Sequence, residues 1–206
     1  MYEMNAREYS ENVMKGYFKK IYPVIAQQIL DYTGVTEGKC IDLGGGPGML
    51  GISMAAITNL EVVIYDLLPE CIEVANENIA ERKLNRRVTA RQGKAEDIQF
   101  PDNSVDLVIS RGSIFFWEDQ KKGIAEVHRV LKPGGWAYIG GGFGTPELLA
   151  EVMEARKDDP EWEKGRACRM KKNPPEHYQK ILEELEIPGG IQYGSAGTWI
   201  IFQKQE

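Results

Sequence analysis

One segment, residues 40–50, constrains the fold of this 206-residue chain more than any other. Its sequence, CIDLGGGPGML, is a short apolar strand that ends in the carboxylate of Asp42 and continues directly into four glycines within five residues. Glycines allow left-handed backbone angles and let a ligand lie against bare main chain. The apolar residues 49–57 then predict a helix whose N-terminus faces that ligand. The segment therefore predicts a strand, a ligand-binding turn and a helix.

The spacing of the glycines indicates which ligand this turn binds. A dinucleotide fingerprint requires Gly-x-Gly-x-x-Gly, but counting from Gly44 and Gly46 places Met49 where the third glycine should stand. An ionised Asp42 at the strand tip would repel a pyrophosphate and attract an ammonium or sulfonium group. Both features favour a cationic nucleoside over a nicotinamide dinucleotide.

A second apolar strand, residues 61–66 (EVVIYD), also ends in an acid. It follows Asp42 by the length of one strand-helix-strand unit, so that Asp66 can reach a ribose. A carboxylate there accepts hydrogen bonds from the ribose hydroxyls of any adenosine-type ligand. Asp66 is therefore a candidate ribose ligand, and the alternative is a cap for the helix that begins at Pro69.

Helical and extended patterns alternate through the first two thirds of the chain. The pattern predicts strands at residues 39–43, 61–65, 87–92, 105–110 and 135–141, and helices at 22–32, 48–57, 69–83 and 119–131. This alternation predicts an α/β fold with helices on both faces of a parallel sheet and the strand tips along one edge. The last third predicts a helix at 175–185 and strands at 191–195 and 198–203, after a polar, charge-mixed stretch at 145–173.

Composition narrows the class of function. A net charge of −6 argues against wholesale binding to nucleic acid or to an anionic membrane surface. The chain shows neither an apolar run of membrane-spanning length nor a signal sequence. Three cysteines without metal spacing and two histidines predict free thiols and no metal centre. We expect a soluble, cytoplasmic protein with a small-molecule partner, and no feature specifies its oligomeric state.

Five landmarks occur in order along the chain: DLGGGPG at residues 42–48, the acid at 66, AEDIQF at 95–100, DNSVDLV at 102–108 and LKPGG at 131–135. In this order they resemble the motifs of class I S-adenosylmethionine-dependent methyltransferases, most closely of the branch that methylates small molecules. The resemblance covers roughly residues 20–145. It implies a Rossmann-like, doubly wound, mostly parallel seven-stranded sheet with a C-terminal antiparallel strand, and S-adenosyl-L-methionine as cofactor.

The resemblance also assigns roles to individual positions. It implies cofactor contacts at the tips of four strands, from Asp42, Gly44, Gly46, Gly48, Asp66, Leu67, Ala95, Glu96, Ser110 and Arg111. Asp42 would hold the ammonium group of the cofactor, directly or through water. Lys94 stands where an aspartate usually contacts the adenine, which leaves backbone contacts at Ala95 and Glu96 as the expectation.

The acceptor pocket is expected beside the fourth strand, lined by Tyr17, Arg111, Phe115 and Phe116. Arg111 could bind a carboxylate or phosphate of the acceptor, or it could instead be paired with Asp42 or Glu118. The length of 206 residues and an apolar content of 42% predict one domain, residues 1–206. The resemblance adds a helical cap at 1–35 and a lid-like insertion at 145–173.

The implied reaction is an in-line displacement that moves a methyl group to a small-molecule acceptor, and no side chain is identified as a base. A non-catalytic module that binds S-adenosylmethionine remains an alternative, and an NAD-dependent oxidoreductase is a less favoured one. A basic cluster lies within the lid-like insertion, and a solvated helix face is its ordinary interpretation: Arg166, Arg169, Lys171 and Lys172.

Overall fold

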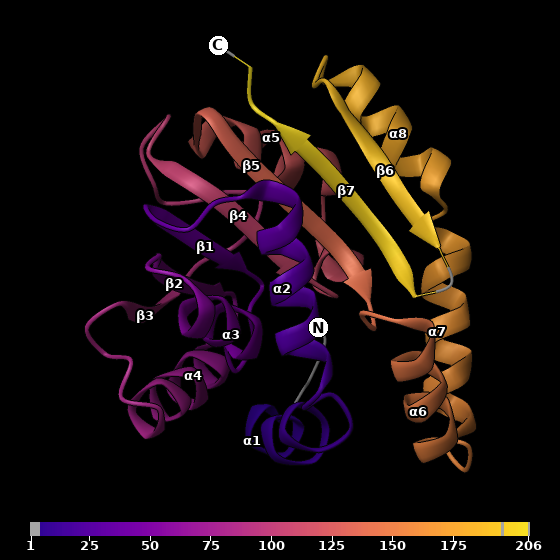
Figure 1. The fold of residues 1–206 in the computed structure, drawn as a ribbon. Helices are drawn as coiled ribbons and strands as arrows, with labels where there is room; N and C mark the ends of the chain where they lie inside the picture. Colours follow the sequence, from indigo (N-terminus) through magenta and orange to yellow (C-terminus); the bar gives the residue numbers. More distant parts are fainter. Residues whose placement is uncertain (1–4, 195, 206) are drawn as a thin grey trace.

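The computed structural model describes residues 5–194 and 196–205, with side chains for all of these except residues 12–14 and 17. Its strands are β1 (Lys39–Leu43), β2 (Glu61–Asp66), β3 (Val88–Gln92), β4 (Val105–Arg111), β5 (Leu131–Gly142), β6 (Gly189–Gly194) and β7 (Gly197–Gln203). In the described part of the chain they form one seven-stranded sheet in the order β3-β2-β1-β4-β5-β7-β6 (Figure 1). Strands β1 to β5 pair in parallel, and β7 runs antiparallel to β5 and β6.

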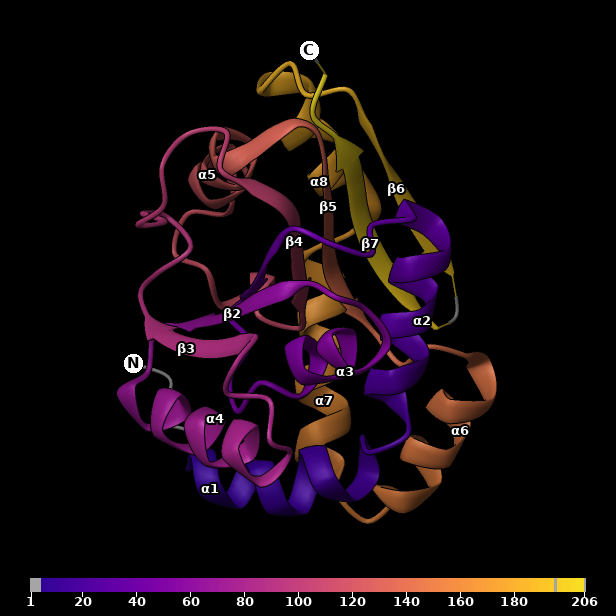
Figure 2. The same ribbon diagram turned by 60° about the vertical axis from the view of Figure 1, so that its left-hand side comes forward.

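Helices cover both faces of this sheet, as Figures 1 and 2 show from two directions. The helices are α1 (Ala6–Glu8), η1 (Tyr9–Tyr17), α2 (Ile21–Thr33), α3 (Met49–Ile57), α4 (Pro69–Glu81), η2 (Ile114–Phe116), α5 (Gln120–Val130), α6 (Pro146–Ala155), α7 (Pro160–Lys172) and α8 (Pro175–Glu184). Buried side chains of α2, α3 and α4 pack in one apolar cluster, and those of α5 and α8 pack in another. The sheet lies between the two clusters.

The alternation of side chains along the strands explains why both faces are apolar. In β7, Trp199 and Ile201 contribute to the cluster under α2 and α3, whereas Ile200 and Phe202 contribute to the cluster under α5 and α8. Successive residues of a strand point to opposite faces, so a continuous apolar run supplies both sides at once. The predicted α/β class, with a mostly parallel seven-stranded sheet, is confirmed.

The order of the strands places a crevice beyond the ends of β1 and β4. From β1 the sheet grows to β2 and β3 on one side and to β4 and β5 on the other. The connections leave β1 and β4 in opposite directions, and such a switch point opens a ligand-binding crevice at the carboxyl ends of the strands. Helices α1, α6 and α7 gather at one end of the molecule, at the bottom of both views (Figures 1 and 2).

Two parts of the chain differ from the sequence prediction. Strand β5 begins at Leu131 rather than near residue 135, because Leu131 pairs with Val105 across an irregularity in the ladder. The polar stretch at 145–173 contains the helices α6 and α7, which the sequence analysis did not predict. The side chains of Thr145 and Asp159 cap these helices, and a proline occupies each first turn. These capping residues and prolines are helix-start signals that the sequence contains, but the polar composition of the stretch hides its helical pattern.

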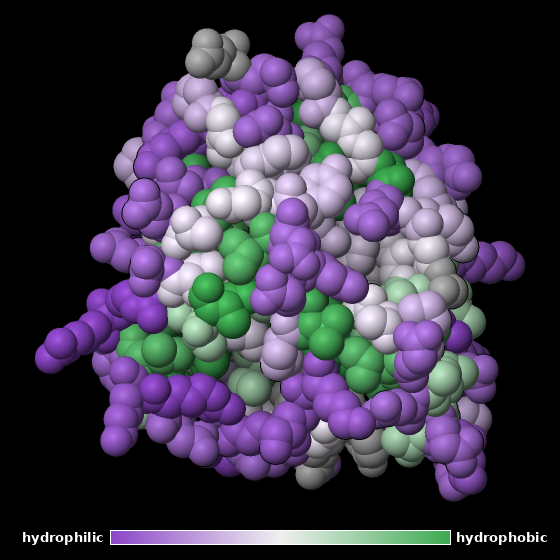
Figure 3. Space-filling model, viewed as in Figure 1, coloured by the Kyte–Doolittle hydropathy of each residue, from purple (hydrophilic) through white to green (hydrophobic). Residues whose placement is uncertain are grey.

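The surface on the side of Figure 1 is mostly hydrophilic. Figure 3 shows hydrophobic patches in the middle and lower part of this face, separated by hydrophilic side chains. Within the described ranges, no helix is both long and apolar enough to cross a bilayer.

Candidate functional site

A cavity of about 580 Å³ lies beyond the carboxyl ends of β1, β2 and β4. The glycine-rich turn after β1 forms one wall, and the segments that follow β2, β3 and β4 form the others. Most of the predicted cofactor residues line it: Asp42, Gly44, Gly46, Asp66, Leu67, Ala95, Glu96 and Arg111. The structure thus brings together side chains that are far apart in the sequence.

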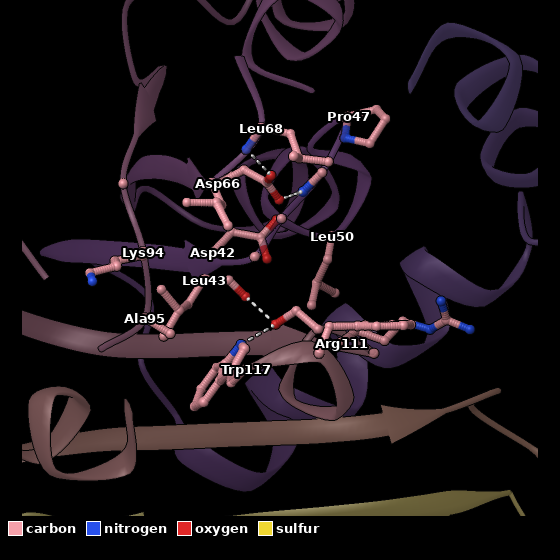
Figure 4. Close-up of a pocket in the computed structure, with 18 of the residues that line it drawn as sticks. Asp42, Leu43, Pro47, Leu50, Asp66, Leu68, Lys94, Ala95, Arg111 and Trp117 are labelled. Carbon is pink, nitrogen blue, oxygen red and sulfur yellow. Dashed lines mark hydrogen bonds between the residues drawn. The ribbon is translucent and has the colours of Figure 1, made fainter. Parts of the chain in front are cut away.

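The glycine turn is held against β2 by its own backbone. The amide of Gly44 donates a hydrogen bond to the carbonyl of Tyr65 over 2.7 Å. Gly44 has a φ of +63°, and a Cβ at this position would lie 2.2 Å from Cβ of Ser113. Only glycine accepts both the left-handed angle and this close approach. The glycines 44–46 of this turn line the cavity, and Figure 4 shows Pro47, which follows them, at the same site.

Asp42 presents one unpartnered carboxylate oxygen inside the protein. Its side chain is 1 % exposed, and Oδ2 accepts a hydrogen bond from the amide of Gly51 at 2.8 Å. Among the described residues no group donates to Oδ1, which is also buried. Burial raises the pKa of Asp42 to about 7. A buried acceptor without a donor is costly, so this oxygen is suited to a ligand that brings a positively charged donor.

Asp66 fixes the turn and the start of the next helix simultaneously. Its Oδ2 accepts from the amide of Gly46 at 2.8 Å, and its Oδ1 accepts from the amide of Leu68 at 2.9 Å (Figure 4). Burial raises the pKa of this carboxyl. The N-cap position of α4 is occupied by Leu68. The alternative that Asp66 is itself the N-cap residue is therefore wrong, although its side chain bonds to the amide of that residue. Asp66 also lines the cavity, and a carboxylate oxygen can accept more than one hydrogen bond.

Residues 93–96 form the wall after β3. The amide of Gly93 donates to the carbonyl of Asp66 at 2.9 Å, which ties this wall to the second strand. A turn follows, closed by the amide of Asp97 bonding to the carbonyl of Lys94 at 3.3 Å. The side chain of Glu96 accepts from the amide of Asp119 at 3.3 Å. Ala95 and Glu96 therefore line the cavity within a well-defined turn.

A hydrogen-bonded chain that the sequence analysis missed connects the first and fourth strands. The hydroxyl of Ser113 donates to the carbonyl of Leu43 at 3.0 Å and accepts from Nε1 of Trp117 at 3.1 Å (Figure 4). Ser110 adds a third bond to the same hydroxyl, 2.7 Å away. Trp117 thus forms part of the cavity wall in a fixed orientation. Its spacing from Ser113 was visible in the sequence, but the contact with Leu43 depends on the sheet.

Arg111 lies between two cavities and has an aromatic environment. Its guanidinium carbon is 4.5 Å from the ring centre of Phe18, 5.2 Å from that of Tyr22 and 5.6 Å from that of Phe143. Its Nε donates to the carbonyl of Gly142 at 2.9 Å.

The predicted pairing of Arg111 with Asp42 or Glu118 is not among the contacts of the described residues, where Arg111 donates to the carbonyl of Gly142 and to the hydroxyl of Tyr22. Figure 4 shows the Arg111 side chain directed away from Asp42. Aromatic faces stabilise the cation here in place of a carboxylate.

The second cavity, of about 500 Å³, adjoins the first and shares Tyr9, Arg111, Gly112 and Phe116 with it. Phe115, Phe116, Phe143 and Trp162 supply aromatic walls, and α7 closes the side opposite the sheet. Of the four residues predicted for an acceptor pocket, Arg111, Phe115 and Phe116 line this cavity, and the side chain of Tyr17 lies outside the described part. Trp162 was not predicted, although a lone tryptophan in a polar stretch is a signal of burial.

Two predicted cofactor residues lie behind the first cavity instead of lining it. Gly48 is the N-cap of α3, where a Cβ would lie 2.3 Å from Cδ1 of Ile64. Ser110 is fully buried and supports Ser113. Both positions shape the site without contributing to its surface.

Comparison with known proteins identifies the family. A family model described as "Methyltransferase domain" matches residues 41–139. A protein of Methanococcus maripaludis, provisionally named an S-adenosyl-L-methionine-dependent methyltransferase, is 37% identical. Its crystal structure aligns with a TM-score of 0.92, over 100% of this chain and 98% of that one. The chain belongs to the class I S-adenosylmethionine-dependent methyltransferases.

Curated relatives in this methyltransferase family include enzymes of quinone biosynthesis. The demethylmenaquinone methyltransferase of Chlorobaculum parvum is 40% identical over 106 residues, which are 52% of this chain and 42% of that protein. The ubiquinone/menaquinone biosynthesis C-methyltransferase of Psychromonas ingrahamii is 31% identical over 166 residues, which are 78% and 64% of the two chains. The chain spans less than half the length of the first of these relatives.

The first cavity fits the cofactor of this methyltransferase family. The unpartnered Oδ1 of Asp42 suits the ammonium group of S-adenosylmethionine, and the carboxylate of Asp66 suits a ribose. Gly44 and Gly46 also line this cavity, and their lack of side chains leaves room for the ligand between the two carboxylates. A pyrophosphate would instead face two buried carboxylates, so the cavity does not suit a nicotinamide dinucleotide.

Proposed function

We propose that this protein transfers a methyl group from S-adenosylmethionine to a small-molecule acceptor held in the second cavity. The observation that carries the proposal is the continuity of the two cavities. The first has the carboxylates and bare glycines that suit the cofactor, and it shares Arg111, Gly112 and Phe116 with the second. An acceptor in the second cavity would therefore lie next to the cofactor.

The protein's part in this reaction is to bind and orient. Asp42 and Asp66 would hold the ammonium group and the ribose, and the turn at Ala95 and Glu96 would enclose the adenine. S-adenosylmethionine, when bound, supplies the methyl group on a positively charged sulfur. Correct positioning of two reactants contributes up to about 7–11 kcal/mol to a barrier in favourable cases. No side chain in either cavity is assigned as a base.

The relatives' names support a ring compound as acceptor. Those relatives are named as a demethylmenaquinone methyltransferase and as a C-methyltransferase of ubiquinone/menaquinone biosynthesis. The second cavity has a wall of Phe115, Phe116 and Trp162 onto which a flat ring can stack. The helical cap at residues 1–35 and the lid at 145–173 would enclose the two reactants within one domain.

We also propose that the reaction takes place in the cytoplasm on a small-molecule acceptor, with neither nucleic acid nor a membrane as a partner. Cys168 is an exposed free thiol, and Cys40 and Cys71 are buried free thiols, which suits a reducing compartment. The net charge of −6 supports the exclusion of polyanionic partners.

Calorimetry followed by a transfer assay tests the proposal. We expect S-adenosylhomocysteine to bind with 1:1 stoichiometry and NADH to give no heat. With tritium-labelled S-adenosylmethionine, we expect label to move to at least one member of a panel of reduced quinones and naphthoates. NADH binding without S-adenosylhomocysteine binding would indicate an oxidoreductase. Cofactor binding without transfer to any member of the panel would indicate the non-catalytic module.

A further inference from the structure

Four arginines line the second cavity, and three of them form no ion pair with any described residue. Its charged lining residues are Arg111, Arg156, Arg166, Arg169 and Glu161. Arg156 is paired with Asp159 and Glu161 with Lys164. In the described part of the chain, Arg111, Arg166 and Arg169 form no ion pair. The accumulation of unpaired positive charge is unexpected in an acidic protein.

Arg166 carries a buried donor without an acceptor. Its Nε is buried and has no hydrogen-bond partner among the described residues. Its Nη1 donates to the sulfur of Met170 at 3.4 Å, and its guanidinium carbon is 6.0 Å from the ring centre of Trp162. A thioether is a weak acceptor, so the directional hydrogen-bonding capacity of this guanidinium is almost unused.

Arg169 lies one helical turn further along α7, on the same side as Arg166. Its guanidinium carbon is 5.8 Å from the ring centre of Phe116. Gly165 leaves space for this side chain, because a Cβ there would lie 3.3 Å from Nη1 of Arg169. Two guanidiniums at this spacing, beside aromatic rings, match a ligand that joins an anionic group to a flat apolar body.

We propose that the methyl acceptor carries a carboxylate or phosphate on an aromatic ring, with the anion bound by Arg166 and Arg169. Phe115, Phe116 and Trp162 pack against the ring, and the cation of Arg111 adds to the positive potential at the mouth shared with the first cavity. The inference rests on the proposed function, because it treats the second cavity as the acceptor pocket. It replaces the sequence-based interpretation of Arg166 and Arg169 as part of a solvated face.

Matched probes test this proposal. Binding of 2-naphthoate is compared with that of 2-naphthamide, and binding of 2-naphthyl phosphate with that of 2-naphthol, by calorimetry with and without saturating S-adenosylhomocysteine. We expect at least one anion to bind about tenfold more tightly than its neutral partner. The better of the two anions identifies the acidic group as a carboxylate or a phosphate.

Three single variants separate the anion site from general charge. We expect R166Q and R169Q each to weaken binding of the preferred anion about tenfold and to leave the affinity for S-adenosylhomocysteine unchanged. K172Q removes the same charge from an exposed position on the same helix and should leave both affinities unchanged. Circular dichroism and thermal unfolding verify that each variant is folded.

Several outcomes would overturn the inference. These are equal affinity for the charged and neutral probes, failure of both anions to bind, or a K172Q effect as large as that of R166Q and R169Q. Failure of S-adenosylhomocysteine to bind would count instead against the proposed function, since the anion preference is measured without it as well.

Discussion

Replacing Asp42 by asparagine should change stability and cofactor binding in opposite directions. The buried, ionised carboxylate destabilises the ligand-free protein but favours binding of the cofactor's ammonium group. In the folded protein burial raises the pKa of Asp42 to about 7, against an ordinary value of 3.8. The gap corresponds to about 4 kcal/mol between the two protonation states. The asparagine variant can still accept the amide of Gly51, so that the glycine turn is preserved.

The direction of the stability effect follows from this pKa. The folded state binds the proton of Asp42 more tightly than the unfolded state, so the associated stability is fully present below about pH 4 and is lost as the pH rises through about 7. At about pH 8 the ligand-free D42N protein should therefore be more stable than the wild type, by at most about 4 kcal/mol. Near pH 4 the two proteins should differ little. Urea unfolding at both pH values measures the difference.

Cofactor binding should respond in the opposite sense. A ligand ammonium beside Oδ1 favours the ionised form of Asp42, so binding below pH 7 must expel a proton. The affinity of the wild type for S-adenosylhomocysteine should fall about tenfold for each pH unit below about 7. D42N should bind more weakly at about pH 8, by about tenfold or more, and should lack this dependence.

The ligand's own amino group titrates equally with both proteins, so the difference between them isolates Asp42. Calorimetry between about pH 5 and about pH 8 provides the comparison. Equal pH profiles for the two proteins, or a D42N protein that is less stable at about pH 8, would refute this reasoning.

Four further substitutions test other parts of the site. G46A should lower the free energy of unfolding by about 1 kcal/mol, because a side chain is strained at the left-handed φ of +54° although no atom lies within 4 Å of the new Cβ. G44A should cost about 1–3 kcal/mol more, because its Cβ would also meet Ser113. Equal losses of the two variants in urea unfolding would contradict this. D66N should weaken S-adenosylhomocysteine binding at least about tenfold in calorimetry, because an amide cannot accept from both Gly46 and Leu68. S113A should cost about 1–3 kcal/mol and shift the tryptophan fluorescence, since it leaves the indole of Trp117 without its acceptor; an unchanged spectrum would argue against that bond.

The central part of the fold could be predicted from the sequence because local patterns and tertiary structure agree there. Strand β1 has the predicted bounds, and α3 and β2 differ from prediction by one residue at one end. Parallel strands buried on both faces are continuous apolar runs, and glycines and acids mark where they stop. The same local signals placed Asp42 and Asp66 at one edge of the sheet.

The acceptor side of the site depended on contacts between distant segments. Trp162 and Arg166 reach the second cavity only because α7 folds back over the end of β5. Likewise, Arg111 lies against aromatic rings and not beside an acid because Phe18 and Phe143, which are far apart in the sequence, meet around it. No periodicity or motif spacing contains this information.

A crystal structure with S-adenosylhomocysteine tests the central claim most directly, namely that the buried Oδ1 of Asp42 is the acceptor for the cofactor's ammonium group. We expect the ligand in the first cavity, its amino nitrogen bonded to Oδ1 directly or through one water molecule, and its ribose hydroxyls at Asp66. A ligand bound elsewhere, or one whose amino group makes no contact with Asp42, would contradict the account.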